Sequence, residues 1–264
     1  MGPRFRLLPH KLEYKALKQA RKAIQKAAKE ADILVISHYH FDHYTPNFEE
    51  NLWLKIETNS AEEIYSNKTI FAKDPKKNIN FSQRRRAYIF RKLNEKIAKK
   101  IEIADGRAFR FGNTLLKFSK PVFHGPAGSK LGWVLITNIK TNSETFTHAS
   151  DVQGPVVNET FNIILNEKPK ILFIGGPPTY LVGFNYEHSY LVTAKENLTN
   201  LVSRIPIIVV DHHLLRDANY HSYLKSIFEM ANAYDHKILN AAEFIGEKPK
   251  LLEAHRKELY QEAK

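Results

Sequence analysis

The chain contains no cysteine among its 264 residues. This absence excludes a disulfide framework, a cysteine-ligated zinc site, an iron–sulfur cluster and a thiol nucleophile. A metal ion would therefore have to be held by histidine, aspartate or glutamate. The sequence also lacks an apolar run near the ~20 residues that a bilayer-spanning helix needs, and residues 1–10 lack the apolar core of a signal peptide. We expect a cytoplasmic protein with no membrane partner.

Acidic residues are the minority among the charged ones. The chain has 40 Lys and Arg against 28 Asp and Glu, which gives a formal net charge of +12. This excess favours acidic partners such as nucleic acid or phosphorylated metabolites, although charge alone does not define a fold or a chemistry. Hydrophobic residues make up 43% and charged residues 26%, which excludes collagen-like, coiled-coil and wholly disordered chains.

The first third of the chain shows two helical patterns around a short apolar run. Apolar residues at three- and four-residue steps predict an amphipathic helix over 11–30, with a basic outer face that we interpret as solvated. The run 32–37 predicts a strand buried on both faces. A second helix is predicted over 83–100, with Ser82 as its N-cap. The arginine run 84–86 is interpreted as a solvated face, with phosphate binding as the alternative.

The remainder of the chain changes from a β-rich to an alternating pattern. Glycine turns separate β-rich segments that predict an antiparallel meander, at 101–103, 108–111, 114–118, 122–123, 131–139 and 145–147. Strands and helices then alternate, as in an α/β fold, with strands at 170–174 and 205–210 and helices at 186–203, 217–234 and 251–263. The sequence has no internal repeat and no long linker, so we predict one domain over 1–264.

Three histidines and an aspartate follow the strand predicted at 32–37: His38, His40, Asp42 and His43. Random placement would produce this pattern in roughly one chain of such composition per thousand. In extended backbone, alternate side chains point the same way, so His38 and His40 can face one metal ion. Asp42 and His43 can face a second ion as the chain turns. Imidazole and carboxylate ligands suit zinc, manganese or iron.

The spacing His-x-His-x-Asp-His resembles the signature of the metallo-β-lactamase superfamily. The resemblance implies an α/β fold of the four-layer αββα type, with a two-metal site completed by a later His, Asp and His at the ends of strands. It points to an uncharacterised archaeal branch of that superfamily and covers essentially the whole chain. The segments that carry it are 2–4, 8–10, 37–43, 151–155, 175–180 and 211–213.

The resemblance also assigns later ligands in chain order. His124 ends the segment 121–123 and would join His38 and His40 on the first ion. Asp151 matches the aspartate that bridges the two ions. The alternative for both His124 and Asp151 is a residue that serves only to form a turn. His148, three residues before Asp151, is interpreted as a structural residue or as a supporting neighbour of the ligands.

The last ligand has two candidates, His212 and His213. Some nuclease branches of the superfamily carry His-x-Ser-x-Arg here, and His212 stands four residues before Arg216, so His212 is the better match. Leu214 replaces the serine, which weakens the case for nuclease activity. The other histidine would support the site, with Asp211 orienting an imidazole ring.

Two further features lie near the expected site. The glycines of segment 175–180 could admit a substrate or phosphate close to the backbone, or could simply form a tight turn. His188 could contact substrate, although we favour a partly exposed helical histidine.

Superfamily members usually begin with strands that precede the first helix. We therefore expect this chain to lack roughly thirty residues of N-terminal β-structure, which would leave a sheet edge unprotected and favour a homo-oligomer.

These residues predict a hydrolase with two metal ions, zinc or alternatively manganese or iron. Asp42 would be the catalytic residue that orients the nucleophile or accepts a proton. Phosphodiesters, nucleic acid, thioesters and lactones all suit such a site, and the net charge tilts the choice towards a small-molecule or nucleic-acid substrate with phosphate. The first alternative is a non-catalytic nucleic-acid-binding protein, disfavoured because a structural zinc site closes at four ligands. An iron redox enzyme with a flavin partner ranks last, since nothing here resembles a flavin-binding domain.

Overall fold

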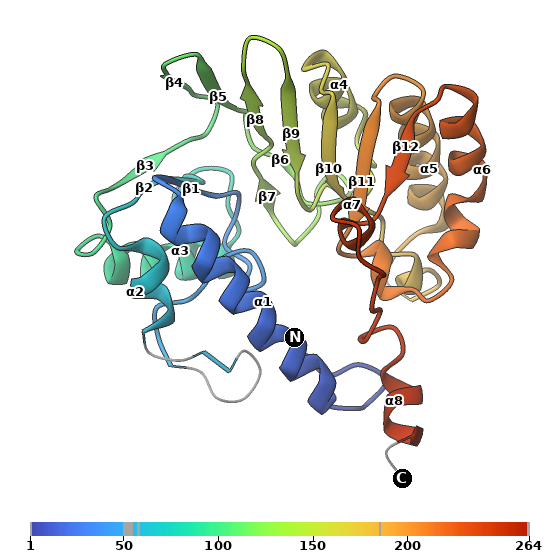
Figure 1. Cartoon of the computed structure of the whole chain (residues 1–264), viewed down its shortest axis with the longest axis horizontal. Coiled ribbons are helices and arrows are strands. Elements are labelled where there is room, and N and C mark those ends of the chain that lie inside the picture. Colours follow the sequence, from blue (N-terminus) through green and yellow to red (C-terminus); the bar gives the residue numbers. More distant parts are fainter. Residues whose placement is uncertain (1, 50–54, 57–58, 185, 263–264) are drawn as a thin grey trace. The chain divides into compact units, whose positions relative to one another are not determined.

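The computed structural model describes residues 2–49, 55–56, 59–184 and 186–262 (Figure 1). The chain divides into two compact units: unit 1 is Met1–Ala104 with Leu252–Lys264, and unit 2 is Asp105–Leu251. Helices flank a sheet in each unit, so the predicted α/β class is confirmed. The four-layer order and the single domain over 1–264 concern the relation between the two units and stay predictions.

Unit 1 is built on a parallel sheet of three strands in the order β1-β2-β3. Its elements are α1 (Lys11–Glu30), β1 (Ile33–Ile36), α2 (Ser60–Tyr65), β2 (Thr69–Ala72), α3 (Phe81–Asn94), β3 (Lys100–Ile103) and α8 (Arg256–Glu262). Its main core joins side chains from the sheet and from helices α2 and α3, among them Ile36, Ile64, Ile70 and Phe90. This core fixes the end of β1. The loop that follows β1 carries His38, His40, Asp42 and His43, which we call the histidine motif.

Helix α1 has the predicted bounds, and His10 and Glu13 form a capping box at its start. Its apolar stripe is less buried than its periodicity implies, because Leu12 and Ile24 are 40% and 50% exposed. Strand β1 pairs with β2 at one edge of the described sheet, and of its four residues only Ile36 is buried. The prediction of a strand buried on both faces is therefore wrong.

Helix α3 begins and ends earlier than predicted. Its N-cap is Asn80, whose side chain accepts a hydrogen bond of 2.7 Å from the Gln83 backbone N–H, so the assignment of Ser82 as the cap is wrong. Asn80 is preferred because its extended backbone and short amide satisfy an otherwise unpaired helical N–H. The helix stops at Asn94, turns and bends follow over 95–99, and β3 begins at Lys100, the last residue of the predicted helix.

Unit 2 contains a sheet of seven strands in the order β12-β11-β10-β9-β8-β5-β4. Its strands are β4 (Ala108–Phe111), β5 (Thr114–Phe118), β6 (Val122–Phe123), β7 (Trp133–Val134), β8 (Thr137–Lys140), β9 (Thr145–Ala149), β10 (Ile171–Gly175), β11 (Ile207–Asp211) and β12 (Lys237–Leu239). Strands β6 and β7 form a separate hairpin. Strands β4, β5, β8 and β9 are antiparallel neighbours, which confirms the meander, whereas β9 to β12 are parallel. The prediction placed β3 in this meander, but β3 pairs with β2 in unit 1.

Helices cover the parallel half of this sheet, and Figure 1 shows α5 and α6 next to β11 and β12. The helices of unit 2 are α4 (Asn158–Asn166), α5 (His188–Val202), α6 (Tyr220–Ala233) and α7 (Ala241–Phe244). Leu172, Leu198, Ile208 and Ile227 belong to one core between the strands and these helices. None of the described helices is long and apolar enough to cross a membrane.

Glu167, the C-cap of α4, makes an ion pair with both Lys117 of β5 and Lys140 of β8. Its carboxylate lies 2.7 Å from Lys117 Nζ and 2.6 Å from Lys140 Nζ. Burial by itself would raise the pKa of Glu167, but the two ammonium groups outweigh burial and hold that pKa below its ordinary value. The carboxylate, in its ionised form, therefore links the end of α4 to two neighbouring strands, β5 and β8.

We expect Glu167→Gln to lower the free energy of unfolding at pH 7, because it removes both ion pairs. The loss should be only about 1 kcal/mol, since solvent screens the partly exposed lysines. The folded-state pKa lies below the unfolded one, so the stabilisation is present above the ordinary glutamate pKa of about 4.3 and is lost as the pH falls through the folded value. Urea unfolding of both proteins at neutral and acid pH measures this. A difference that stays the same in acid would contradict the assignment.

Candidate metal centre

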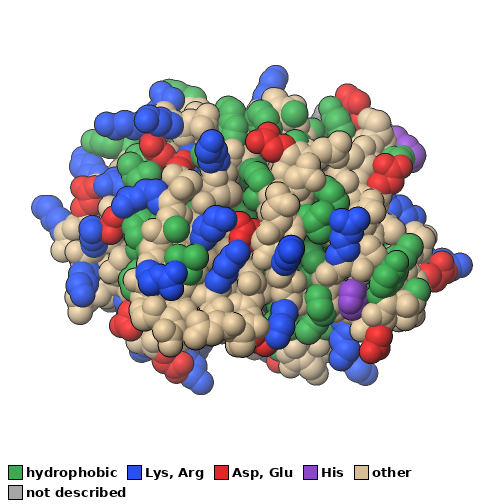
Figure 2. All heavy atoms as spheres, turned by 90° about the horizontal axis from the view of Figure 1, so that it is seen from above, with side chains coloured by type: hydrophobic (Ala, Val, Ile, Leu, Met, Phe, Trp, Pro, Cys, Tyr) green, Lys and Arg blue, Asp and Glu red, His purple; other side chains and the backbone are tan. Residues whose placement is uncertain are grey.

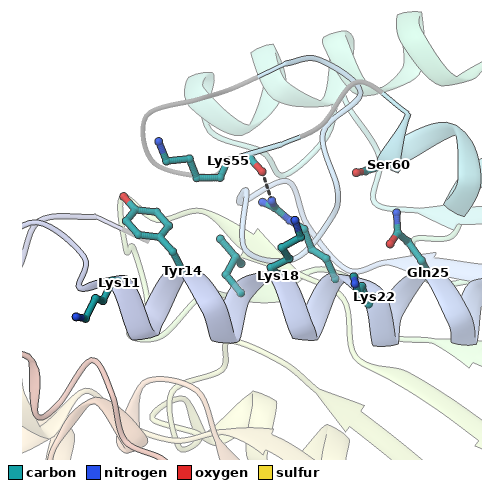
Figure 3. A pocket seen from close by; sticks show the side chains of 9 residues that line it. Lys11, Tyr14, Lys18, Lys22, Gln25, Lys55 and Ser60 are labelled. Atoms are coloured by element: carbon teal, nitrogen blue, oxygen red, sulfur yellow. Dashed lines mark hydrogen bonds between the residues drawn. The ribbon is translucent and has the colours of Figure 1, made fainter.

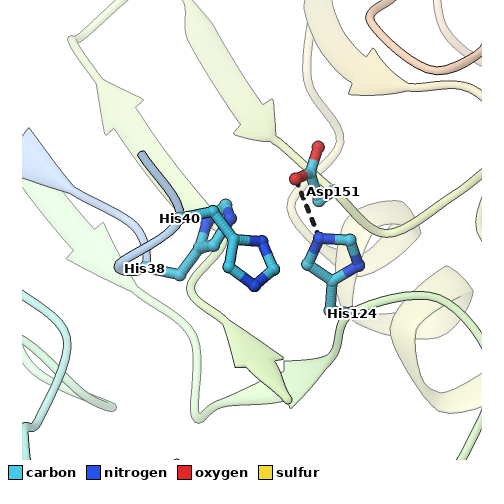
Figure 4. A group of neighbouring side chains, drawn as sticks. All are labelled: His38, His40, His124 and Asp151. Atoms are coloured by element: carbon cyan, nitrogen blue, oxygen red, sulfur yellow. Dashed lines mark ion pairs between the residues drawn. The ribbon is translucent and has the colours of Figure 1, made fainter. Parts of the chain in front are cut away.

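The loop that follows β1 carries the histidine motif of unit 1. His38 is fully buried, and its Nδ1 lies 3.0 Å from Ser37 Oγ. The His38 ring centroid lies 4.7 Å from that of His40 and 4.2 Å from that of His43. His43 Nε2 lies 3.9 Å from Asp42 Oδ1. The loop thus gathers its imidazoles around His38, and Figure 4 draws His38 and His40 on it.

Helix α3 holds this loop in place through two side chains. The Tyr39 N–H donates to Gln83 Oε1 at 3.1 Å, and Gln83 Nε2 lies 3.4 Å from His40 Nε2. Arg86 donates to the Tyr39 carbonyl at 3.4 Å, and its guanidinium lies 4.4 Å from the centroid of the Phe41 ring. Arg86 is therefore not part of a fully solvated face. Sequence patterns do not reveal these contacts, because they depend on how α3 packs on the loop.

In unit 2, three predicted ligands come together from the ends of three strands. His124 follows β6, Asp151 lies just beyond β9, and both side chains are buried. His124 Nε2 lies 2.9 Å from Asp151 Oδ2, as the dashed line in Figure 4 marks. His212 follows β11, and its Nε2 lies 3.4 Å from Asp151 Oδ1. One buried carboxylate therefore faces two imidazoles.

Both His212 and His213 belong to this cluster. Asp151, His212 and His213 each offer a ligand atom, and these atoms lie within 4.8 Å of one another. His212 has a φ of 64°, a left-handed conformation that is uncommon for residues other than glycine. Asp211 Oδ1 accepts a hydrogen bond of 2.7 Å from the His212 backbone N–H. Asp211 thus supports the backbone of His212, whereas the prediction gave it an imidazole ring as its partner.

The electrostatics of the β11 end favour a neutral imidazole at His213. Burial, reinforced by the nearby His212 and Arg216, lowers the pKa of His213 to about 2. Arg216 lies 3.4 Å from His213 Nδ1 and also donates to the Tyr180 hydroxyl. Burial raises the pKa of Asp211. A neutral imidazole keeps the lone pair that a metal ion requires.

The glycines after β10 have a packing role. A Cβ built on Gly175 would lie 2.3 Å from the Ser150 carbonyl oxygen, to which the Gly175 N–H donates at 2.7 Å. A Cβ on Gly176 would lie 2.6 Å from the Leu214 Cβ. The glycines thus let β10 approach the backbone next to Asp151, which favours the tight-packing interpretation over a phosphate-binding one.

Two of the weaker candidates, His148 and His188, lie outside the groups of ligand atoms that the described residues form. His148 is partly buried within β9, and His188 is exposed at the first position of α5. This position of His188 agrees with the interpretation that we favoured, a helical histidine that is partly exposed. Leu214 is fully buried in the core, so this position offers no polar group in place of the nuclease serine.

A cationic pocket of about 460 Å³ runs along α1 in unit 1 (Figure 3). Its described lining residues are Lys11, Tyr14, Leu17, Lys18, Arg21, Lys22, Gln25, Lys55 and Ser60. Arg21 donates to the Lys55 carbonyl, and Lys55 Nζ lies 5.5 Å from the centroid of the Tyr14 ring. Part of the outer face of α1 that was predicted to be simply solvated is therefore concave and basic.

Comparison with solved structures gives likenesses at low sequence identity. A CmlA β-hydroxylase variant aligns with a TM-score of 0.49 and 11% identity, over 79% of this chain and 42% of that one, so this chain spans less than half of it. Tm1679, a metal-dependent hydrolase of the β-lactamase superfamily, aligns with a TM-score of 0.43 and 11% identity, over 78% and 75% of the two chains. Unliganded yeast PDE1 gives a TM-score of 0.46 and 15% identity, over 85% and 69%. Likenesses of this size do not decide the function.

No protein-family model matches the chain. Curated relatives, however, match it over nearly its whole length. A UPF0282 protein of Methanopyrus kandleri is 43% identical over 256 residues, which cover 97% of this chain and 86% of that protein. UPF0282 proteins of Thermococcus sibiricus and Methanocaldococcus jannaschii are 41% and 40% identical, over 98% of this chain and 83% and 84% of theirs. These matches confirm the predicted archaeal relationship, and the chain belongs to the UPF0282 family.

Proposed function

We propose that this chain is a metal-dependent hydrolase with one pair of metal ions. The ligands would come from the histidine motif (His38, His40, Asp42 and His43) and from the Asp151 cluster (His124, Asp151, His212 and His213). The observation that carries the proposal is the buried Asp151 carboxylate, which faces His124 Nε2 at 2.9 Å and His212 Nε2 at 3.4 Å. The donor set consists of imidazoles and carboxylates without any thiolate, and it fits a divalent cation such as zinc. Manganese and iron accept the same ligands.

Each ligand has a place in this proposal. One ion would be held by His38, His40 and His124, and the other by Asp42, His43 and His212. Asp151 would contribute to both sites, and His213 would support them. When bound, such a pair of ions lowers the pKa of water and polarises the bond under attack. The side chain of Asp42 is 44% exposed, which leaves its carboxylate accessible to orient a nucleophile or to accept a proton.

The charge of the chain favours a substrate with phosphate. The net charge is +12, and Figure 2 shows many Lys and Arg side chains, with fewer Asp and Glu side chains, on the face drawn. A cationic surface raises the local concentration of anionic substrates and their association rate. We therefore propose a phosphodiester or nucleic acid as the substrate, ahead of a thioester or lactone.

The test is metal-dependent hydrolysis by the purified, zinc-loaded chain, with bis(p-nitrophenyl) phosphate, a lactone and a thioester as substrates. Asp42→Asn should reduce kcat for the preferred substrate by about 100-fold or more, because a positioned acid or base contributes at least that much. Asp235→Asn is the matched control, since Asp235 is exposed and already adopts a left-handed φ of 54° that asparagine tolerates. Its kcat should not change.

The outcomes separate the hydrolase from its alternative. Hydrolysis that survives chelation, or that is equal in Asp42→Asn, would contradict the proposal. Tight zinc binding and nucleic-acid binding without turnover of any substrate would favour a non-catalytic nucleic-acid-binding protein with a structural metal site.

A further inference from the structure

One side of α3 exposes a row of aromatic and cationic side chains. This row, the α3 stripe, consists of Phe81, Arg84, Arg85, Tyr88 and Lys92, all of which are exposed. Their three-, four- and seven-residue spacings place them on one face of a helix. The opposite face is buried and consists of Gln83, Ala87, Phe90 and Asn94. The stripe is therefore not used to pack α3 onto unit 1.

Helix stability explains only part of the composition of α3. Its 14 residues include five cations and no acidic residue. Arg91 and Lys92 in the last turn complement the helix dipole, whereas cations near the start of the helix oppose it. Phe81 is 82% exposed and Tyr88 is 64% exposed. Single exposed apolar residues are ordinary, but two aromatic rings among cations on one helix face make a patch with its own chemistry.

We propose that the α3 stripe binds single-stranded nucleic acid, a claim that rests on the proposed hydrolase function and names its substrate class. Phe81 and Tyr88 offer ring faces on which unpaired bases stack, and Arg84, Arg85 and Lys92 lie between and beside them to contact phosphates. The two rings are seven residues apart, or about 10 Å along the helix axis. A duplex does not fit this stripe as well, because its bases already stack on each other.

The stripe lies on the helix that supports the histidine motif. Gln83, on the buried face of α3, lies 3.4 Å from His40 and accepts a hydrogen bond from the Tyr39 N–H. One helix diameter, about 10 Å, therefore separates the stripe from the contact with the motif. A nucleic-acid strand bound along α3 would therefore lie near the loop of unit 1 that carries the histidine motif.

The aromatic part of the proposal is tested by the binding of a short fluorescein-labelled single-stranded oligonucleotide. The Asp42→Asn protein is used as the parent, so that the oligonucleotide is not hydrolysed. Phe81→Ala and Tyr88→Ala should each weaken binding by roughly 5- to 100-fold, since stacking of one base is lost. Tyr88→Phe should bind like the parent protein, because the ring is kept. Tyr234→Ala is the matched control, as Tyr234 is 53% exposed on unit 2, and it should have no effect.

The salt dependence of binding tests the cationic part. Arg85→Gln should reduce the slope of log K against log salt concentration by about 0.7, the value for one phosphate contact on a single strand. Lys15→Gln removes an exposed cation of α1 that lies outside the stripe, and it should leave the slope unchanged. If the slope fell equally in Arg85→Gln and Lys15→Gln, binding would depend on overall charge, and this result would overturn the proposal.

The outcomes also separate the stripe from the hydrolase. Binding that depends on Phe81 and Tyr88, without hydrolysis by the zinc-loaded chain, would support the stripe and contradict the hydrolase. Metal-dependent hydrolysis of a small phosphodiester with single-strand binding unaffected by Phe81→Ala and Tyr88→Ala would do the opposite. Duplex binding as tight as single-strand binding would contradict the proposed stacking.

Discussion

Asp151→Asn is expected to weaken metal binding by at least 100-fold and to remove metal-dependent hydrolysis. Asp151 is 1% exposed and its two oxygens face His124 and His212 separately. Asparagine keeps the shape but has one neutral oxygen in place of two anionic ones, so it cannot serve two ions. Loss of a mere supporting group already costs metal sites 10- to 100-fold in affinity, and loss of a carboxylate that we propose to bind both ions should cost more.

Titration of the metal-free proteins with zinc measures this effect, and circular dichroism shows whether the variant folds. Asp235→Asn again serves as the control and should bind zinc like the unchanged protein. A folded Asp151→Asn variant that binds zinc with unchanged affinity would contradict the assignment of Asp151 as a ligand.

Arg256→Ala is expected to lower the free energy of unfolding by about 3–5 kcal/mol, because it leaves a buried carboxylate without its charged partner. Arg256 of α8 is fully buried and makes two hydrogen bonds with Glu13 of α1, at 2.8 Å from Nε and 2.7 Å from Nη2. Its Nη1 donates to the carbonyls of Gly2 and Leu7. The His10 N–H donates to the same carboxylate of Glu13 at 2.7 Å. One side chain therefore connects the two ends of unit 1.

Denaturant unfolding of Arg256→Ala, Glu13→Ala and the double variant measures the coupling. The double variant should lose less than the sum of the single losses, since the second substitution removes the unpaired charge that the first one leaves. Glu258→Gln, an exposed position on α8, should change stability by less than about 0.5 kcal/mol. A loss below about 1 kcal/mol for Arg256→Ala would contradict the importance of this pair.

Local pattern was sufficient for elements whose side chains show a clear period or sharp turn signals. The bounds of α1, β4, β5 and β6 agree with those predicted from such signals. The sequence patterns did not predict five of the short elements, namely α2, β2, α4, α7 and β12. Segments of this length carry too little periodicity, and their burial is decided by neighbours from elsewhere in the chain.

The site shows the same division. The spacing of the histidine motif predicts a cluster within one loop, and the structure brings His38, His40 and His43 together. The left-handed backbone of His212 and the support from Gln83 depend on tertiary packing, so composition and spacing could not reveal them. The Glu13–Arg256 pair joins residues 243 positions apart, beyond the reach of any local pattern.

The central proposal is that the predicted ligands, among them His40 and His124, bind the same pair of metal ions. The most direct measurement is the metal content of the purified, zinc-loaded chain, compared with His40→Ala in unit 1, His124→Ala in unit 2 and His221→Ala as an exposed control on α6. We predict about two ions per chain in the unchanged protein and in the control. Each of the other two single variants should lose metal. Full metal content in either of them, or no metal uptake by the unchanged chain, would contradict the claim.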